Sequence, residues 1–215
     1  MLRNIISNDF FTITCLISLV IITITKLIAP KRFDYFTLII ANNKYLKIYS
    51  REQKFLNVFD SLLFINLILS LTVFCLIVLR HTTETTNISV NLLFKIAFGI
   101  GVFSLIKVLL ERLISSILEI DKLITPYLFQ KISYKNYLGL FLLPINALLV
   151  FTQNSSINIF YIIITVLITT YIIGIITSFK THQNLIKHNF LYFILYLCTL
   201  EISPCIILYK VFIAK

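Results

Sequence analysis

Long apolar stretches follow one another along the chain, separated by polar segments that hold most of the charged residues. A helix needs about 20 mostly apolar residues to cross the hydrocarbon core of a bilayer. Six stretches reach or approach that length, and they are apolar on every side, whereas the strands of a membrane barrel alternate. The pattern predicts an all-α polytopic membrane protein, a bundle of about six transmembrane helices. The predicted spans are residues 10–29, 61–79, 90–110, 137–151, 157–179 and 190–213.

Composition supports a chain that faces lipid. Hydrophobic residues make up 59% of the 215 positions and charged residues only 13%, against roughly 25% charged in soluble domains. Four glycines and four prolines leave little material for a flexible linker. We therefore expect a single integral membrane domain over residues 1–215.

The net charge of +10 comes from basic residues placed in loops. Most of them follow the first, third and fifth predicted spans, which puts these three loops on one side of the membrane. By the positive-inside rule that side is cytoplasmic, so both termini are expected on the non-cytoplasmic side. Because most of the positive charge lies in these loops, it indicates topology and not a nucleic-acid surface.

The loop after the first span carries an amphipathic pattern. Its basic residues recur at intervals of three, four and three, which places them on one helical face: Lys44, Lys47, Arg51 and Lys54. The adjoining arc is apolar: Tyr45, Ile48, Tyr49, Phe55 and Leu56. The spacing predicts an interfacial helix with its apolar side in the acyl boundary and its basic side towards anionic headgroups. The alternative is the positive-inside bias alone.

A second amphipathic pattern extends the third span. Leu113 and Ile117 begin an apolar face that is opposed by Ser115. This pattern predicts that the third helix continues out of the bilayer until Pro126, with Glu111 paired locally to Lys107, four residues earlier. The aromatic-rich stretch that follows would return the chain to the membrane.

Glu201 is the strongest candidate for a functional residue, because it lies near the middle of the last predicted span. An acid at that depth is protonated, paired or next to water, and such acids often mark function. The alternative is a structural acid bonded to a neighbouring helix. Pro204 removes a backbone donor beside it and is expected to kink the helix. Lys95 in the third span is the preferred partner, although snorkelling to the interface is the commoner fate of such a lysine.

Catalytic and cofactor motifs are missing from the sequence. It has no Gly-x-Ser-x-Gly elbow and no HExxH pattern, and no predicted span holds the paired carboxylates of acid–base catalysis. His182 and His188 lie six residues apart, which is a poor spacing for a metal site. We therefore expect no catalytic residues, no metal and no cofactor, and we do not expect an enzyme.

Two stretches resemble an uncharacterised family of bacterial inner-membrane proteins, a domain of unknown function found widely in Bacteroidota. One is residues 137–144 (YLGLFLLP); the other is residues 193–204 (FILYLCTLEISP), followed by ILYK at 207–210. The likeness covers most of the chain, but only the second stretch is distinctive. It implies a bacterial cytoplasmic membrane, and it implies no activity.

These observations favour a non-enzymatic subunit or assembly factor that scaffolds a cell-envelope complex. Its expected partners are a bilayer with anionic headgroups and a membrane protein or a second copy of the chain, with no nucleic acid. A small carrier or proton-coupled module that uses Glu201 is the alternative, and an intramembrane enzyme ranks third.

Overall fold

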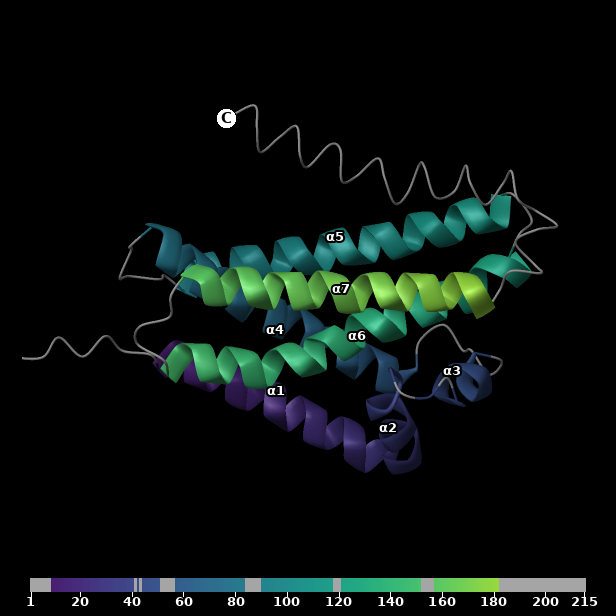
Figure 1. The fold of residues 1–215 in the computed structure, drawn as a ribbon, viewed down its shortest axis with the longest axis horizontal. Coiled ribbons are helices and arrows are strands. Elements are labelled where there is room, and N and C mark those ends of the chain that lie inside the picture. The colour runs from purple at the N-terminus through teal and green to yellow at the C-terminus, as the bar shows by residue number, and fades with distance from the viewer. Residues whose placement is uncertain are drawn as a thin grey trace, which may run out of the picture.

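The computed structural model describes residues 9–40, 42, 44–50, 57–83, 90–117, 121–151 and 157–181. These residues form seven α-helices: α1 (Asp9–Ile28), α2 (Pro30–Thr37), α3 (Lys44–Tyr49), α4 (Val58–Thr83), α5 (Val90–Ile117), α6 (Asp121–Phe151) and α7 (Ile157–Thr181). The long helices lie side by side along one axis, and the short α2 and α3 lie together at one end (Figure 1). The prediction of an all-helical chain is confirmed for this part of the protein.

Three of the described helices are long and apolar enough to cross a membrane. The candidate spans are Phe11–Ile28 in α1, Val58–His81 in α4 and Val90–Ile117 in α5, while α7 has a shorter apolar stretch, Ile159–Gly174. The first five predicted spans each fall on a helix, and the sixth, residues 190–213, lies outside the described residues. Long apolar faces on these helices are uncovered, as Phe98 of α5 with 74% exposure illustrates, and this is the surface expected of a protein in lipid.

Helices α4 and α6 form the centre of the bundle: α4 contacts α1, α5 and α6, and α6 contacts α1, α4, α5 and α7. Contacts between α4 and α6 advance in the same direction along both chains: Asn136 bonds to Asp60, and Asn146 bonds to Ser70. The two helices are therefore parallel, although α5 separates them in the sequence. The starts of α4 and α6 and the end of α1 consequently lie at the end of the bundle that carries α2 and α3 (Figure 1).

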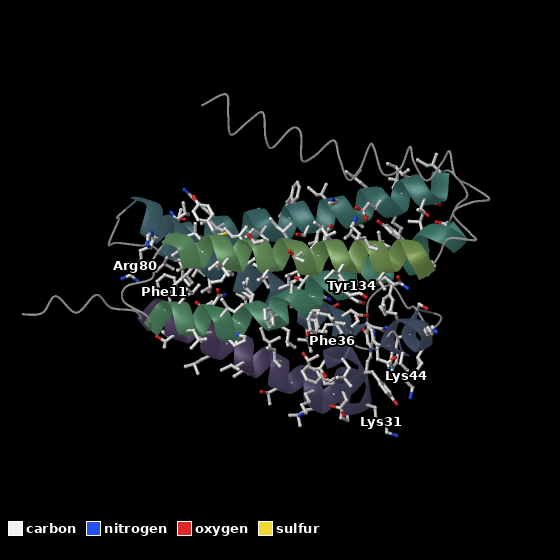
Figure 2. The ribbon with its side chains drawn as sticks, viewed as in Figure 1. Phe11, Lys31, Phe36, Lys44, Arg80 and Tyr134 are labelled. Atoms are coloured by element: carbon white, nitrogen blue, oxygen red, sulfur yellow. The ribbon has the colours of Figure 1, made fainter. Side chains whose placement is uncertain are left out.

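We call this end of the bundle the basic end, because Lys31, Lys44 and Lys47 are exposed there. Figure 2 shows Lys31 and Lys44 at this end, and Arg80 with Phe11 at the opposite end. At that opposite end the Arg80 guanidinium lies 5.9 Å from the Phe11 ring centroid.

The interior holds two clusters of buried apolar side chains. One lies among the long helices: Phe11, Val73, Phe74, Leu76, Ile77, Leu93, Leu142, Leu149 and Phe160. The other joins the basic end of α4 and α6 to α2 and α3: Phe33, Phe36, Ile39, Tyr45, Leu46, Phe59, Leu63, Phe129 and Tyr134. The second cluster means that α2 and α3 belong to the packed body of the protein.

The predicted continuation of the third helix to Pro126 is wrong. Helix α5 ends at Ile117, and α6 begins at Asp121 and runs through Pro126 without a break. Since Pro126 is only the sixth residue of α6, it removes one backbone hydrogen bond near the helix start. The aromatic stretch after it is the first half of α6, so the fourth helix is much longer than predicted.

At the end of α5 the apolar face is exposed and the polar face is buried, the opposite of an amphipathic helix in a soluble protein. The apolar residues Leu113 and Ile117 are 55% and 70% exposed, whereas Ser115 is buried and donates to Asp121 Oδ1 at 2.8 Å. In lipid the apolar face needs no cover, and the polar face is the one that requires protein partners.

Candidate functional site: a buried arginine cluster at the basic end

Helices α2 and α3 attach to the bundle through aromatic side chains. Pro30 occupies the first turn of α2, where its fixed φ suits a helix start. Phe36 is fully buried and packs edge-on against Tyr45 of α3 and Phe59 of α4, with ring centroids 5.4 and 5.9 Å apart. The Tyr45 ring also stacks on Phe129 of α6 at 5.7 Å. Four helices, α2, α3, α4 and α6, are thus held around one aromatic core.

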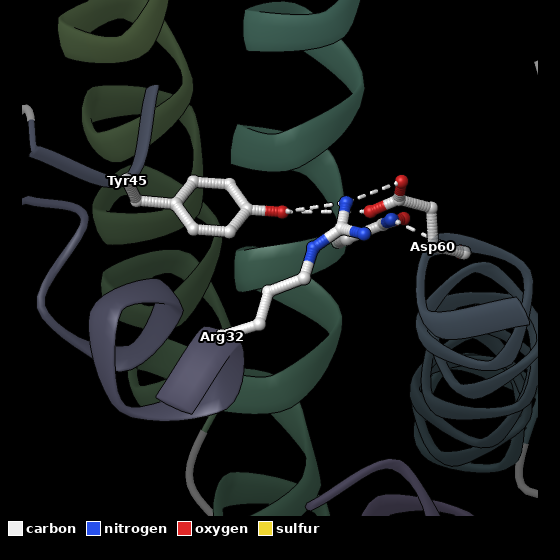
Figure 3. Close-up of polar contacts among 4 residues, drawn as sticks. Arg32, Tyr45 and Asp60 are labelled. Atoms are coloured by element: carbon white, nitrogen blue, oxygen red, sulfur yellow. Dashed lines mark hydrogen bonds and ion pairs between the residues drawn. The ribbon is translucent and has the colours of Figure 1, made fainter. Parts of the chain in front are cut away.

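A charged cluster lies beside this core. Arg32 Nη2 donates to Asp60 Oδ2 at 2.8 Å, and the Tyr45 hydroxyl lies 3.4 Å from Asp60 Oδ1 and 3.5 Å from Arg32 Nη2 (Figure 3). The first distance is that of a charge-assisted bond, and the other two are longer and weaker. Asn136 of α6 donates to the Asp60 backbone carbonyl at 3.4 Å. We call Arg32, Tyr45 and Asp60 the Arg32 cluster.

Aromatic rings contact the guanidinium as well. The Arg32 Cζ lies 4.6 Å from the centroid of Phe59 and 4.9 Å from that of Tyr49, within the range of cation–π attraction. With 12% of its side chain exposed, Arg32 is removed from water more than a surface residue is. Such a desolvated cation is stable only because the Asp60 carboxylate and the rings surround it.

Tyr45 acts as a neutral donor in the cluster. Burial raises the pKa of Tyr45 well above its ordinary value, and the nearby Asp60 carboxylate raises this pKa further, while the Arg32 guanidinium opposes both. The Tyr45 hydroxyl therefore keeps its proton at neutral pH and can donate to Asp60. The cluster is a set of mutual contacts that join α2, α3 and α4.

The variant Asp60→Asn is expected to lower the free energy of unfolding by about 2 kcal/mol, because the Arg32 guanidinium would then bond to a neutral amide in place of a carboxylate. Asp34→Asn is the matched control, since Asp34 is an exposed acid on the neighbouring α2, and we expect no change there. Thermal unfolding of both variants in detergent measures the difference. Equal melting temperatures for the two variants would contradict a stabilising role for the pair.

A second ion pair joins α5 to α6. Lys131 Nζ donates to Glu111 Oε1 at 2.6 Å, and their side chains are only 4% and 1% exposed. The predicted local pairing of Glu111 with Lys107 is not the contact that the structure shows. Together with the bond between Ser115 and Asp121, this pair fixes the start of α6 against the end of α5.

Of the residues singled out from the sequence, the structure describes Lys44, Lys47 and Lys95. Lys44 and Lys47 are exposed on α3 at the basic end. Lys95 is exposed near the start of α5, towards the other end of the bundle. The other members of the predicted basic stripe, Arg51 and Lys54, lie outside the described residues, as do Glu201 and Pro204.

The orientation predicted for the α3 segment is wrong in one respect. Tyr45 was placed on an arc facing the acyl boundary, but it is fully buried against protein, together with Leu46. Ile48 remains exposed. The reason is that Phe36, Phe59 and the Arg32 cluster offer Tyr45 both apolar contact and a hydrogen-bond partner, which lipid cannot do.

Sequence reasoning missed Arg32 and Asp60. Arg32 was counted as one of several basic loop residues, and Asp60 directly precedes a predicted span. One signal was available, because the chain has only nine acids and one of them begins an apolar helix next to a strongly basic loop. That placement pointed to a charged partner but not to which one.

The described residues hold no group of three or more His, Cys, Asp or Glu side chains that could bind a metal. The Arg32 cluster and the Glu111–Lys131 pair consist of side chains that bond to one another. Chemically, both sites are suited to fixing helices in place.

Comparison with known proteins gives one match. The family model for a domain of unknown function, DUF4271, matches residues 11–212. No curated protein and no solved structure shows significant similarity to the chain. The family match confirms the resemblance to a domain of unknown function that the sequence indicated.

Proposed function

The chain belongs to the DUF4271 family, and we propose that it is a non-enzymatic membrane subunit or assembly factor of a cell-envelope complex. The observation that carries the proposal is that the Arg32 cluster fixes α2 and α3 as a rigid platform. The platform presents Lys31, Lys44 and Lys47 to the surroundings. A fixed basic surface beside membrane helices suits contact with acidic groups of a partner.

The proposed location is a bacterial cytoplasmic membrane, with the basic end towards the cytoplasm. The asymmetry of exposed lysines between the two ends of the bundle supports this orientation. In that setting the platform lies at the depth of anionic headgroups, which attract basic residues by about 1 kcal/mol each. The bilayer thus orients the platform, and an acidic protein surface completes the contact.

Co-purification from native membranes tests the proposal. The tagged full chain, extracted in mild detergent, is expected to bring a stoichiometric partner that quantitative mass spectrometry identifies. The triple variant Lys31→Glu, Lys44→Glu, Lys47→Glu should lower partner recovery at least about tenfold, which corresponds to 1.4 kcal/mol. Replacement of the same three lysines by arginine is the matched control and should retain the partner.

All three lysines are exposed, and the Lys44 ammonium also lies 5.1 Å from the Tyr35 ring centroid. The arginine variant should therefore melt at the temperature of the unmodified protein, and the glutamate variant only slightly lower because it loses this cation–π contact. A chain that purifies from native membranes with no partner would contradict the proposal. Recovery of the partner at full yield with the glutamate variant would remove the platform from the contact.

A further inference from the structure

The middle of the interface between α4 and α6 contains buried polar atoms without hydrogen bonds. Asn66 is completely buried, and neither its Oδ1 nor its Nδ2 has a partner among the described residues. Ser70 Oγ and Asn146 Oδ1 are in the same condition, in side chains 2% and 1% exposed. Four such atoms gather at this one interface, whereas native proteins leave only a few per 100 residues.

These side chains lie close to one another. Asn66 and Ser70 are one helical turn apart on the same face of α4, a rise of about 6 Å. Asn146 of α6 donates from Nδ2 to the Ser70 backbone carbonyl at 2.8 Å. This bond places the side-chain oxygen of Asn146, Oδ1, beside Asn66 and Ser70. Measured from Val58, this level is about 12–18 Å along α4, near the middle of a hydrocarbon core of about 30 Å.

We propose that Asn66, Ser70 and Asn146 form an enclosed hydration site that holds one or two water molecules between α4 and α6. The four unpaired atoms comprise two acceptors, one donor and one hydroxyl that can act as either. Water matches this set, because each molecule donates two hydrogen bonds and accepts two. Unsatisfied polar groups are costly in lipid, which supplies no partners of its own.

A bound cation fits the site less well. It would leave the Asn66 Nδ2 donor unpaired, and it would put a full charge at the bilayer centre. The acids of α1, α4 and α6 are Asp9, Asp60 and Asp121, all of them near helix ends and far from this level. The guest is therefore neutral.

Close packing of α4 against α6 accompanies the site. Between the levels of Asn136 and Asn146, a Cβ atom on Gly139 would lie only 2.6 Å from the Leu67 Cα. Leu67 lies between Asn66 and Ser70 on α4, so the two helices touch backbone to backbone at the level of the site. The water is a structural component held between α4 and α6.

The sign of a change in melting temperature tests the proposal. Asn66→Leu keeps the side-chain size and removes the amide. If water is bound, the variant should melt lower, since Ser70 and Asn146 lose the molecule that satisfied them, and adding Ser70→Ala should recover part of the loss. A dry site predicts the opposite, because removing an unsatisfied amide would raise the melting temperature, and that result would overturn the proposal.

Thr72→Val is the matched control on the same helix. Thr72 is also fully buried, but its hydroxyl donates to the Ile68 carbonyl within α4 at 2.7 Å, so little change is expected.

The melting temperature of the unmodified protein should be the same in sodium, potassium and choline chloride. A rise specific to one cation would overturn the neutral guest in favour of an ion. An experimental density map should show separate water peaks at hydrogen-bond distance from Asn66 and Ser70. Apolar side chains filling this space, with no such peaks, would contradict the proposal.

Discussion

Lys131→Met should destabilise the protein by about 3–5 kcal/mol, the usual cost of removing one partner from a buried ion pair. The Glu111 carboxylate, 1% exposed, would remain in the interior without its cation. Because an apolar pair of similar volume is often as stable as a buried ion pair, the double variant Glu111→Leu, Lys131→Met should recover most of the loss. Chemical or thermal unfolding in detergent measures both.

Lys47→Met is the control for this experiment, since Lys47 is exposed on α3 and its loss removes no buried partner. A Lys131→Met variant as stable as Lys47→Met would show that the pair carries no weight. The single variant Glu111→Leu completes the set. If the double variant lost as much stability as Lys131→Met and Glu111→Leu lose together, the two charges would not be coupled to each other.

Gly139→Ala is expected to cost about 3 kcal/mol, at the upper end of the range for overpacked interiors. The new Cβ would lie 2.6 Å from the Leu67 Cα and 2.9 Å from its Cβ, so α4 and α6 would have to move apart. Since the nearest atom belongs to the backbone, shortening the Leu67 side chain in a Leu67→Ala, Gly139→Ala double variant should not restore stability. Thermal unfolding again provides the measurement.

Gly99→Ala supplies the contrast for Gly139. A Cβ atom on Gly99 of α5 would meet no heavy atom within 4 Å, and alanine is favoured over glycine in a helix by roughly 0.5–1 kcal/mol. Gly99→Ala is therefore expected to be neutral or slightly stabilising. Similar losses for Gly99→Ala and Gly139→Ala would mean that the close approach of α4 and α6 is not what Gly139 provides.

Hydropathy located the long described helices well, because in a bilayer the length of an apolar run is the main requirement for a span. It located the ends less well where polar residues continue a helix. The first half of α6 contains the polar residues Gln130, Lys131 and Asn136, so hydropathy did not predict it as part of the fourth helix. In the structure all three are buried. Their burial depends on contacts with α4 and α5, which no local pattern contains.

The candidate site was accessible from the sequence only in part. The basic character of the α3 segment was evident from its spacing, and Lys44 and Lys47 are exposed as a basic surface requires. The Arg32 cluster was not evident, because Arg32 and Asp60 lie 28 positions apart and meet only after α2 folds back onto the bundle. The unpaired amide of Asn66 became visible only with the packing of α4 against α6.

The parallel pairing of α4 and α6 also sets an order of events during synthesis. Ser70 and Asn146, which bond to each other, are 76 residues apart. At 5–20 residues per second, roughly 4–15 s separate the production of the two residues. During that interval α4 has emerged with Asn66 and Ser70 and without the helix that covers them. A nascent chain at this stage has α1 and the Arg32 cluster to anchor α4, and it reaches its final arrangement only when α6 packs beside α4.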